Sequence, residues 1–125
     1  MIATPKKWAW MGIALILAIG LIHLIEAPES FEKATYKGLL FVANGIAAAV
    51  AAAGIYRGAR VWGWGLGAFV AAASFIGYMI SRTVGLPGIP QEEWLEASGL
   101  ASLVVEALFV ALAVRVWQSR SPQQA

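Results

Sequence analysis

Four long apolar stretches are the feature of this sequence that most restricts its fold. They cover residues 8–25, 36–56, 62–81 and 98–117, and each is close to the roughly 20 residues that an α-helix needs to cross a bilayer. Hydrophobic residues make up 60% of the 125 residues and charged residues 13%, with a mean hydropathy of +0.72. A water-soluble domain of this size cannot bury so much apolar surface. The sequence therefore predicts an all-α integral membrane protein with four transmembrane helices.

The connectors between the stretches predict how the helices are arranged. Only residues 57–61 join the second stretch to the third, which makes these two helices antiparallel neighbours. The other two connectors, residues 26–35 and 82–97, are longer and rich in proline and glutamate. We therefore expect residues 1–125 to form a single domain, an antiparallel four-helix bundle.

The start of the chain has features of a secretory signal peptide, because Lys6 and Lys7 precede an apolar run. That run is long for a signal core, and it ends in His23 and Glu26 instead of a small-residue cleavage site. We expect it to be retained as the first transmembrane helix.

The charges at the ends of the stretches predict the orientation in the membrane. One side carries six cations and no acid: Lys6, Lys7, Arg57, Arg60, Arg115 and Arg120. The other side carries three cations and six acids: Lys33, Lys37, Arg82, Glu26, Glu29, Glu32, Glu92, Glu93 and Glu96. Because Lys and Arg favour the cytoplasmic side, both termini are expected to be cytoplasmic (N-in, C-in) in a bacterial inner membrane. Five tryptophans fall on the same side, as expected for interfacial anchors: Trp8, Trp10, Trp62, Trp64 and Trp117.

Composition and missing motifs argue against several classes of function. The net charge is +2 and the pI is near 9.2, but the basic residues form no continuous stripe, so nucleic acid is not an expected partner. The absence of cysteine excludes disulfides, thiolate metal sites and thiol redox chemistry. No phosphate-binding glycine loop, zinc-protease motif or nucleophile elbow is present, and the pair Ser102 and Glu106 is too common a pattern to indicate catalysis. An enzyme is therefore the least favoured class.

Small residues line the second and third helices. One ridge contains Ala43, Ala47, Ala51, Gly54 and Gly58, and the other contains Gly63, Gly65, Gly67, Ala71 and Ala72. In lipid, small residues let helix backbones approach closely. This pattern predicts tight packing within the chain, and association of two copies through one ridge is the alternative.

Three polar residues are expected at a similar depth, where polar groups are costly in lipid and tend to line sites. Glu106 lies eight residues below Ser98, or roughly 12 Å at 1.5 Å per residue. Asn44 and Ser74 lie at a comparable depth in the second and third helices. We expect one polar layer in the bundle core, in which Glu106 is the titratable group and Asn44 and Ser74 tune it.

A second polar layer is expected nearer the outer surface. It comprises His23, Glu26, Tyr78, Arg82 and Ser102. His23 and Glu26 share one face of the first helix because they are three residues apart. Stacked on each other, the two layers predict a polar pocket that opens outward.

These residues also have structural interpretations. A protonated Glu106 that bonds to Asn44 or Ser74 would simply hold helices together. His23 would then reach towards water at the interface. Arg82 would be an ordinary outer charge, or else the counter-ion of Glu106 or of an anionic ligand.

The loop between the third and fourth stretches is expected to cover the pocket. Residues 81–88 are apolar for a loop, and their glycines and proline permit bends and prevent a helix. We expect this segment to fold back on the outer mouth as a lid or re-entrant turn, with an ordinary solvated loop as the alternative. Residues 91–96 are expected to form a short amphipathic turn, with Trp94 and Leu95 towards lipid.

Several of these outer segments occur together in a recognisable order. They are residues 23–31, residues 36–38, residues 40–41 and the run Ser81-Arg82-Thr83-Val84-Gly85-Leu86-Pro87. In this respect the chain resembles a group of small four-helix bacterial membrane proteins of actinobacterial type. The resemblance spans most of the chain and implies the same topology, but it implies no activity.

Three classes of function remain open. The leading hypothesis is a small binding module or accessory subunit whose outward pocket takes up a small ligand, a metal cation or protons. The set His23, Glu26 and Glu106 is chemically suited to Zn²⁺, Mn²⁺ or Fe²⁺. The alternative is transport of protons or a small solute, which would require a homo-oligomer because four helices are few for a carrier. A structural subunit of a larger membrane complex is the third.

Overall fold

The computed structural model describes residues 5–94 and 96–119 of the chain. Within them the chain forms four α-helices and no strand: α1 (Lys6–Lys33), α2 (Thr35–Tyr56), α3 (Arg60–Thr83) and α4 (Ala97–Gln118). All four are long and apolar enough to cross a membrane. The prediction of an all-α chain with four potential spans is confirmed.

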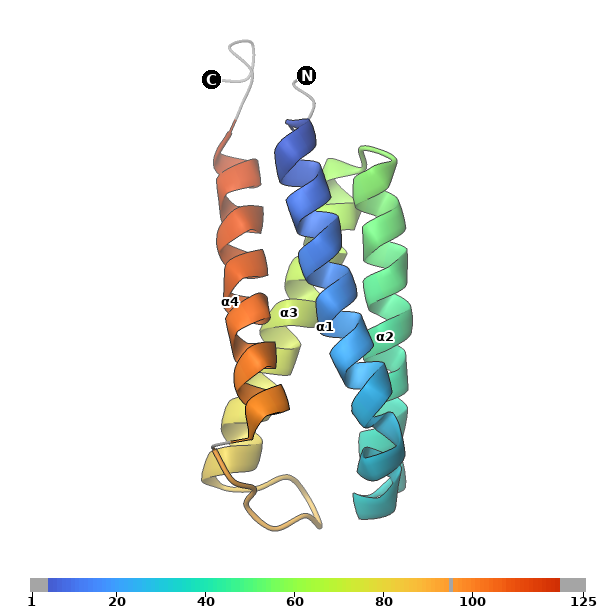
Figure 1. Cartoon of the computed structure of the whole chain (residues 1–125), viewed down its shortest axis with the longest axis vertical. Helices are drawn as coiled ribbons and strands as arrows, with labels where there is room; N and C mark the ends of the chain where they lie inside the picture. The colour runs from blue at the N-terminus through green and yellow to red at the C-terminus, as the bar shows by residue number, and fades with distance from the viewer. Residues whose placement is uncertain (1–4, 95, 120–125) are drawn as a thin grey trace.

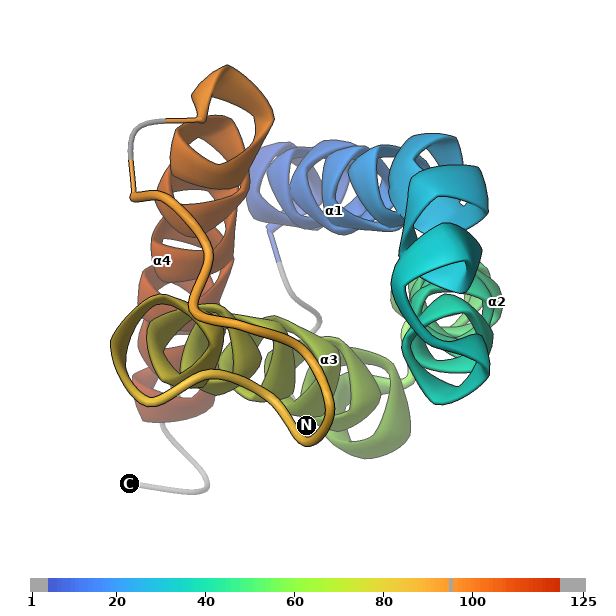
Figure 2. The same ribbon diagram turned by 90° about the horizontal axis from the view of Figure 1, so that it is seen from below.

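The helices run alternately up and down and are arranged in a ring when seen along the bundle (Figures 1 and 2). Each helix packs against the next in sequence, and α4 closes the ring against α1, whereas α1 and α3 barely touch across the diagonal. The start of α1, the α2–α3 turn and the end of α4 lie at one end, which we call the turn end (Figure 1). The long loop between α3 and α4 lies at the other, which we call the loop end.

Helix α1 is longer than expected, because it continues past residue 25 to Lys33 and leaves only Ala34 before α2. Pro28 lies inside it and lacks the N–H that would bond to the carbonyl four residues back. Packing against α2 compensates, since the ring of Phe31 covers Gly38 so closely that a Cβ there would come within 2.2 Å of it. The expected connector at residues 26–35 is therefore mostly helix.

Helices α2 and α3 meet backbone to backbone at the turn end. A Cβ on Gly63 would lie 2.7 Å from the carbonyl carbon of Gly54 and the nitrogen of Ile55. Gly58, with φ of 79°, reverses the chain between the two helices, a conformation that favours glycine. For Gly54 and Gly63, close packing within the chain is confirmed, while association of two copies stays a prediction.

The hydrophobic core fills the half of the bundle nearer the turn end. Its centre is an aromatic plug, Trp64 and Phe109, whose rings stack with centroids 5.5 Å apart and are 1% and 0% exposed. Gly12 and Gly67 make room for it, because a Cβ at Gly12 would come within 2.4 Å of Trp64 and one at Gly67 within 2.5 Å of Phe109. Trp64 was expected as an interfacial anchor, and that prediction is wrong.

The α2–α3 contact predicts that alanine destabilises the protein at Gly63 of α3 but not at Gly65. Gly63→Ala would push a methyl group into the α2 backbone, and overpacking of this kind typically destabilises by about 1–3 kcal/mol. Gly65→Ala is the matched control, because its Cβ would meet only Trp117 at 3.9 Å. Thermal unfolding in detergent should show a lower midpoint for Gly63→Ala alone; equal midpoints would contradict the close approach.

Candidate functional site

A cavity of about 440 Å³ occupies the half of the bundle nearer the loop end. Its wall comes from the later part of α1, the first half of α2, the later part of α3 and the first half of α4. Most core residues lie on the other parts of the same helices, although Val70 belongs to both the core and the cavity wall. Trp64 and Phe109 belong to the core and do not line the cavity. The wall includes all eight residues predicted for the site: His23, Glu26, Asn44, Ser74, Tyr78, Arg82, Ser102 and Glu106. That they bind a ligand stays a prediction.

Glu106 is the most deeply buried acid on this wall, with 1% of its surface exposed. The hydroxyl of Ser102, one turn earlier on α4, donates a hydrogen bond to Oε2. The other oxygen, Oε1, is buried and has no hydrogen-bond partner. The expected bond to Asn44 or Ser74 and the expected counter-ion Arg82 are therefore not what holds this carboxyl group.

Asn44 and Ser74 bond to each other across α2 and α3. The Ser74 hydroxyl donates to the carbonyl of Val70 at 2.7 Å, so its oxygen can only accept from Nδ2 of Asn44 at 2.6 Å. This chain of bonds determines which way the Asn44 amide points. It leaves Oδ1 of Asn44 buried without a partner.

His23 is buried and does not reach towards water. Its Nδ1 lies 2.8 Å from the carbonyl oxygen of Ile19, which can only accept, so Nδ1 carries the hydrogen. The ring packs against Phe41 with centroids 4.8 Å apart. In the neutral ring, Nε2 is then left as an acceptor.

The residues considered for a metal do not assemble into a metal site. Glu26 accepts a hydrogen bond from the Ser98 hydroxyl and so links α1 to α4. Within residues 5–94 and 96–119, no group of three or more His, Cys, Asp or Glu is placed to hold a metal ion. His23, Glu26 and Glu106 all line the cavity, but they do not form such a group.

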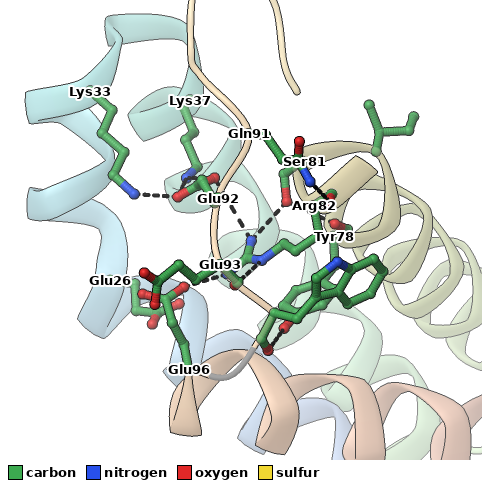
Figure 3. Close-up of polar contacts among 12 residues, drawn as sticks. Glu26, Lys33, Lys37, Tyr78, Ser81, Arg82, Gln91, Glu92, Glu93 and Glu96 are labelled. Atoms are coloured by element: carbon green, nitrogen blue, oxygen red, sulfur yellow. Dashed lines mark hydrogen bonds and ion pairs between the residues drawn. The ribbon is translucent and has the colours of Figure 1, made fainter. Parts of the chain in front are cut away.

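Arg82 anchors the loop instead of facing Glu106 (Figure 3). Its guanidinium lies over the Tyr78 ring, 3.9 Å from the centroid. It donates to the Ser81 hydroxyl at 2.7 Å, to the Glu93 carbonyl at 2.9 Å and to the Glu96 carboxylate. All of these partners lie at the mouth of the cavity. We call the loop and the charged side chains that hold it there the cover of the cavity, and Arg82 belongs to it.

Glu92 is the centre of that cover. Its carboxylate bonds to Lys33 at the end of α1 and to Lys37 on α2 at 3.0 Å, and it lies 3.7 Å from Arg82 on α3 (Figure 3). Partial burial would by itself raise the pKa of Glu92, but the hydrogen bonds and charges of Lys33 and Lys37 outweigh this and lower its pKa below 4.5. One loop carboxylate thus ties three helices together.

The loop lies at the mouth of the cavity, where Leu86, Glu92 and Glu96 line it, although residues 81–83 of the expected loop belong to α3. Its contacts include the Tyr36 hydroxyl, which donates to the Pro87 carbonyl, and two turns at Gly85 and Gly88 with φ of 85° and 75°. Residues 91–94 have no regular structure, so the expected amphipathic turn is wrong there, and the Tyr78 hydroxyl donates to the Trp94 carbonyl at 2.8 Å. Leu95 and Arg120, for which we also made predictions, lie outside the described residues.

Lys33, Lys37 and Glu92 are site residues that our sequence analysis did not single out. We counted them only as charges for orientation. The available signal was the acid-rich loop opposite two lysines at helix ends on the same side. Which acid would meet which lysine depends on the path of the loop.

Comparison with known proteins gives no further guide to function. No known family matches the chain, and neither a curated protein nor a solved structure shows significant similarity to it. The resemblance to small actinobacterial-type membrane proteins therefore stays a prediction, and function has to be argued from the cavity.

The Glu92 contacts predict that one charge holds the loop in place. Glu92→Gln should speed amide exchange in residues 84–94, most clearly at Glu92 N–H, which donates to the Ser81 carbonyl at 2.9 Å. Hydrogen bonds to charged groups contribute about 1.5–3 kcal/mol, which corresponds to about ten- to hundredfold faster exchange. Glu93→Gln removes the same charge from the adjacent residue, whose side chain forms none of the ion pairs of the loop among the described residues, so it should change the exchange rates little. Equal exchange in both variants would refute the anchoring role.

The lowered pKa of Glu92 predicts loss of this contribution in acid. Because the pKa is lower in the folded protein than its ordinary value of 4.5, the stabilisation is complete above about 4.5 and is lost as pH falls through the folded value. The midpoint of thermal unfolding should therefore be higher for wild type than for Glu92→Gln at pH 6. This difference in midpoint should shrink as the pH falls below 4.5 and vanish once the pH is below the folded pKa of Glu92. A gap that stays constant with pH would contradict the ionised state.

Proposed function

We propose that the chain is a multi-pass protein of a bacterial cytoplasmic membrane, with both termini inside and the loop end outside. The distribution of Lys and Arg supports this orientation. Large apolar side chains are exposed on the outer face of every helix, as lipid contact requires: for example Leu21, Leu40, Phe69 and Leu108. The cavity would then open to the outside.

We propose further that this cavity binds a small ligand and that the protein is a binding module or accessory subunit. The observation that carries this proposal is Oε1 of Glu106, an acceptor without a partner at the deep end of a cavity of about 440 Å³. A buried polar atom without a partner costs about 1–3 kcal/mol, and a ligand that donates a hydrogen bond would recover it. The volume lies in the usual range for ligand pockets.

The plug below the cavity favours binding over transport. Trp64 and Phe109 fill the bundle between the cavity and the turn end. A solute in the cavity has no open way past these rings. A purely structural role, in turn, does not require a cavity that is lined by a buried carboxyl group.

Cysteine labelling tests the outward-open pocket, since the chain has no cysteine of its own. Gly77 lines the cavity, and a side chain there would meet nothing within 4 Å, so Gly77→Cys should fold normally. A membrane-impermeant thiol reagent added outside intact cells should label it. Ala71→Cys, on the same helix but in the core, is the control and should stay unlabelled.

Two results would refute this proposal in different parts. Labelling of Gly77→Cys only in inverted vesicles would show that the orientation is wrong. No labelling from either side would show that the cavity is closed to water.

A further inference from the structure

The deep part of the cavity offers hydrogen-bond acceptors and few free donors. Three acceptors from three helices are unused: Oε1 of Glu106, Oδ1 of Asn44 and Nε2 of neutral His23. The donors beside them are consumed within the protein, since Ser102 bonds to Glu106 and Ser74 to Val70. The Tyr78 hydroxyl also turns away, to the Trp94 carbonyl. A ligand that fits this wall has to bring donors.

The charges around the cavity favour a positive ligand. Its three cations, Lys33, Lys37 and Arg82, all pair with carboxylates of the loop. Glu26 and Glu106 also line the cavity, and neither has an ion pair among the described residues. A carboxylate in an apolar surrounding is stabilised by a cation with N–H donors more than by a neutral donor.

The rest of the wall is apolar and extends to the side of the bundle. Leu40 on α2 and Phe69 on α3 line the cavity, yet they are 63% and 70% exposed, so the cavity continues to the outer face between these helices. A ligand with an apolar tail can occupy this part. Because the described residues hold no metal cluster, an organic cation fits the wall better than a metal ion.

Given the proposed binding function, on which this inference rests, we propose that the ligand is a small amphiphilic primary amine in its ammonium form. The ammonium group donates to Oε1 of Glu106, and Asn44 and His23 offer further acceptors on the same cavity wall. The apolar tail lies along Phe41, Val70 and Phe69 towards the opening between α2 and α3. A primary ammonium has three N–H donors, so it can bond to Glu106 and still donate to another acceptor or to water.

A matched series of probes tests this class on the wild-type protein. Octylamine, octan-1-ol, octanoate and trimethyloctylammonium share one tail and differ in the head group. Titration in detergent, with bound molecules counted by native mass spectrometry, should show octylamine tightest, by about tenfold or more over octan-1-ol. Octanoate should bind weakest. Equal binding of trimethyloctylammonium, which lacks N–H donors, would overturn the primary-amine assignment.

Two variants test whether octylamine binds at Glu106. Glu106→Gln keeps the shape but removes the charge, so it should weaken octylamine by about tenfold or more and leave octan-1-ol unchanged. Glu32→Gln removes the same charge from an exposed position of α1 outside the cavity and should have no effect. Equal loss in both variants would refute a specific site. Thermal unfolding of each variant shows whether it is folded, and the wild-type series does not depend on them.

Failure of this inference is distinguishable from failure of the binding function. If Gly77→Cys is labelled from outside and octanoate or octan-1-ol binds as tightly as octylamine, the pocket stands and the amine assignment is wrong. If Gly77→Cys is not labelled from either side and no probe binds, the binding function itself is wrong.

Discussion

The structure depends on close packing at one end of the bundle. Gly54 and Gly63 bring α2 and α3 into backbone contact, and the aromatic plug fills the sockets at Gly12 and Gly67. In lipid, helices have no hydrophobic driving force between them, so in the proposed membrane location such tight contacts would hold them together. The hydrophobic core and the aromatic plug fill the half nearer the turn end, whereas the cavity lies in the half nearer the loop end.

Ion pairs and hydrogen bonds, more than apolar packing, hold the loop between α3 and α4 at the mouth of the cavity. Glu92 reaches cations on three helices, and Arg82 bonds to the loop backbone and to Glu96. Buried charges are tolerated only when they are paired and hydrogen-bonded, and here each partner comes from a different segment. The same contacts hold the loop at the mouth and neutralise the cations there. The acid deeper in the cavity is left without one.

The polar groups of the cavity differ from ordinary interhelical bonding. Ser74 and Asn44 do link α3 to α2, and Ser102 stays within α4, but each arrangement leaves one acceptor unused. Buried polar atoms in folded proteins nearly always have partners, so two unpartnered acceptors on one cavity wall are unusual. They raise the free energy of the empty cavity, and a donor group lowers it. This is the physical reason for our proposal that the cavity binds a ligand.

The sequence by itself determined four segments long and apolar enough to cross a membrane, and it singled out eight of the side chains that line the cavity. Both follow from counts along one helix: the length of an apolar stretch, and the depth of Glu106, Asn44 or Ser74 below its end. Only the tertiary structure decided the continuation of α1 past Pro28, the burial of Trp64 and the partners of Arg82 and Glu92. Lys37 and Glu92 are 55 residues apart, and the path of the loop brings them together. Contacts of this kind depend on distances through space, which local sequence patterns do not contain.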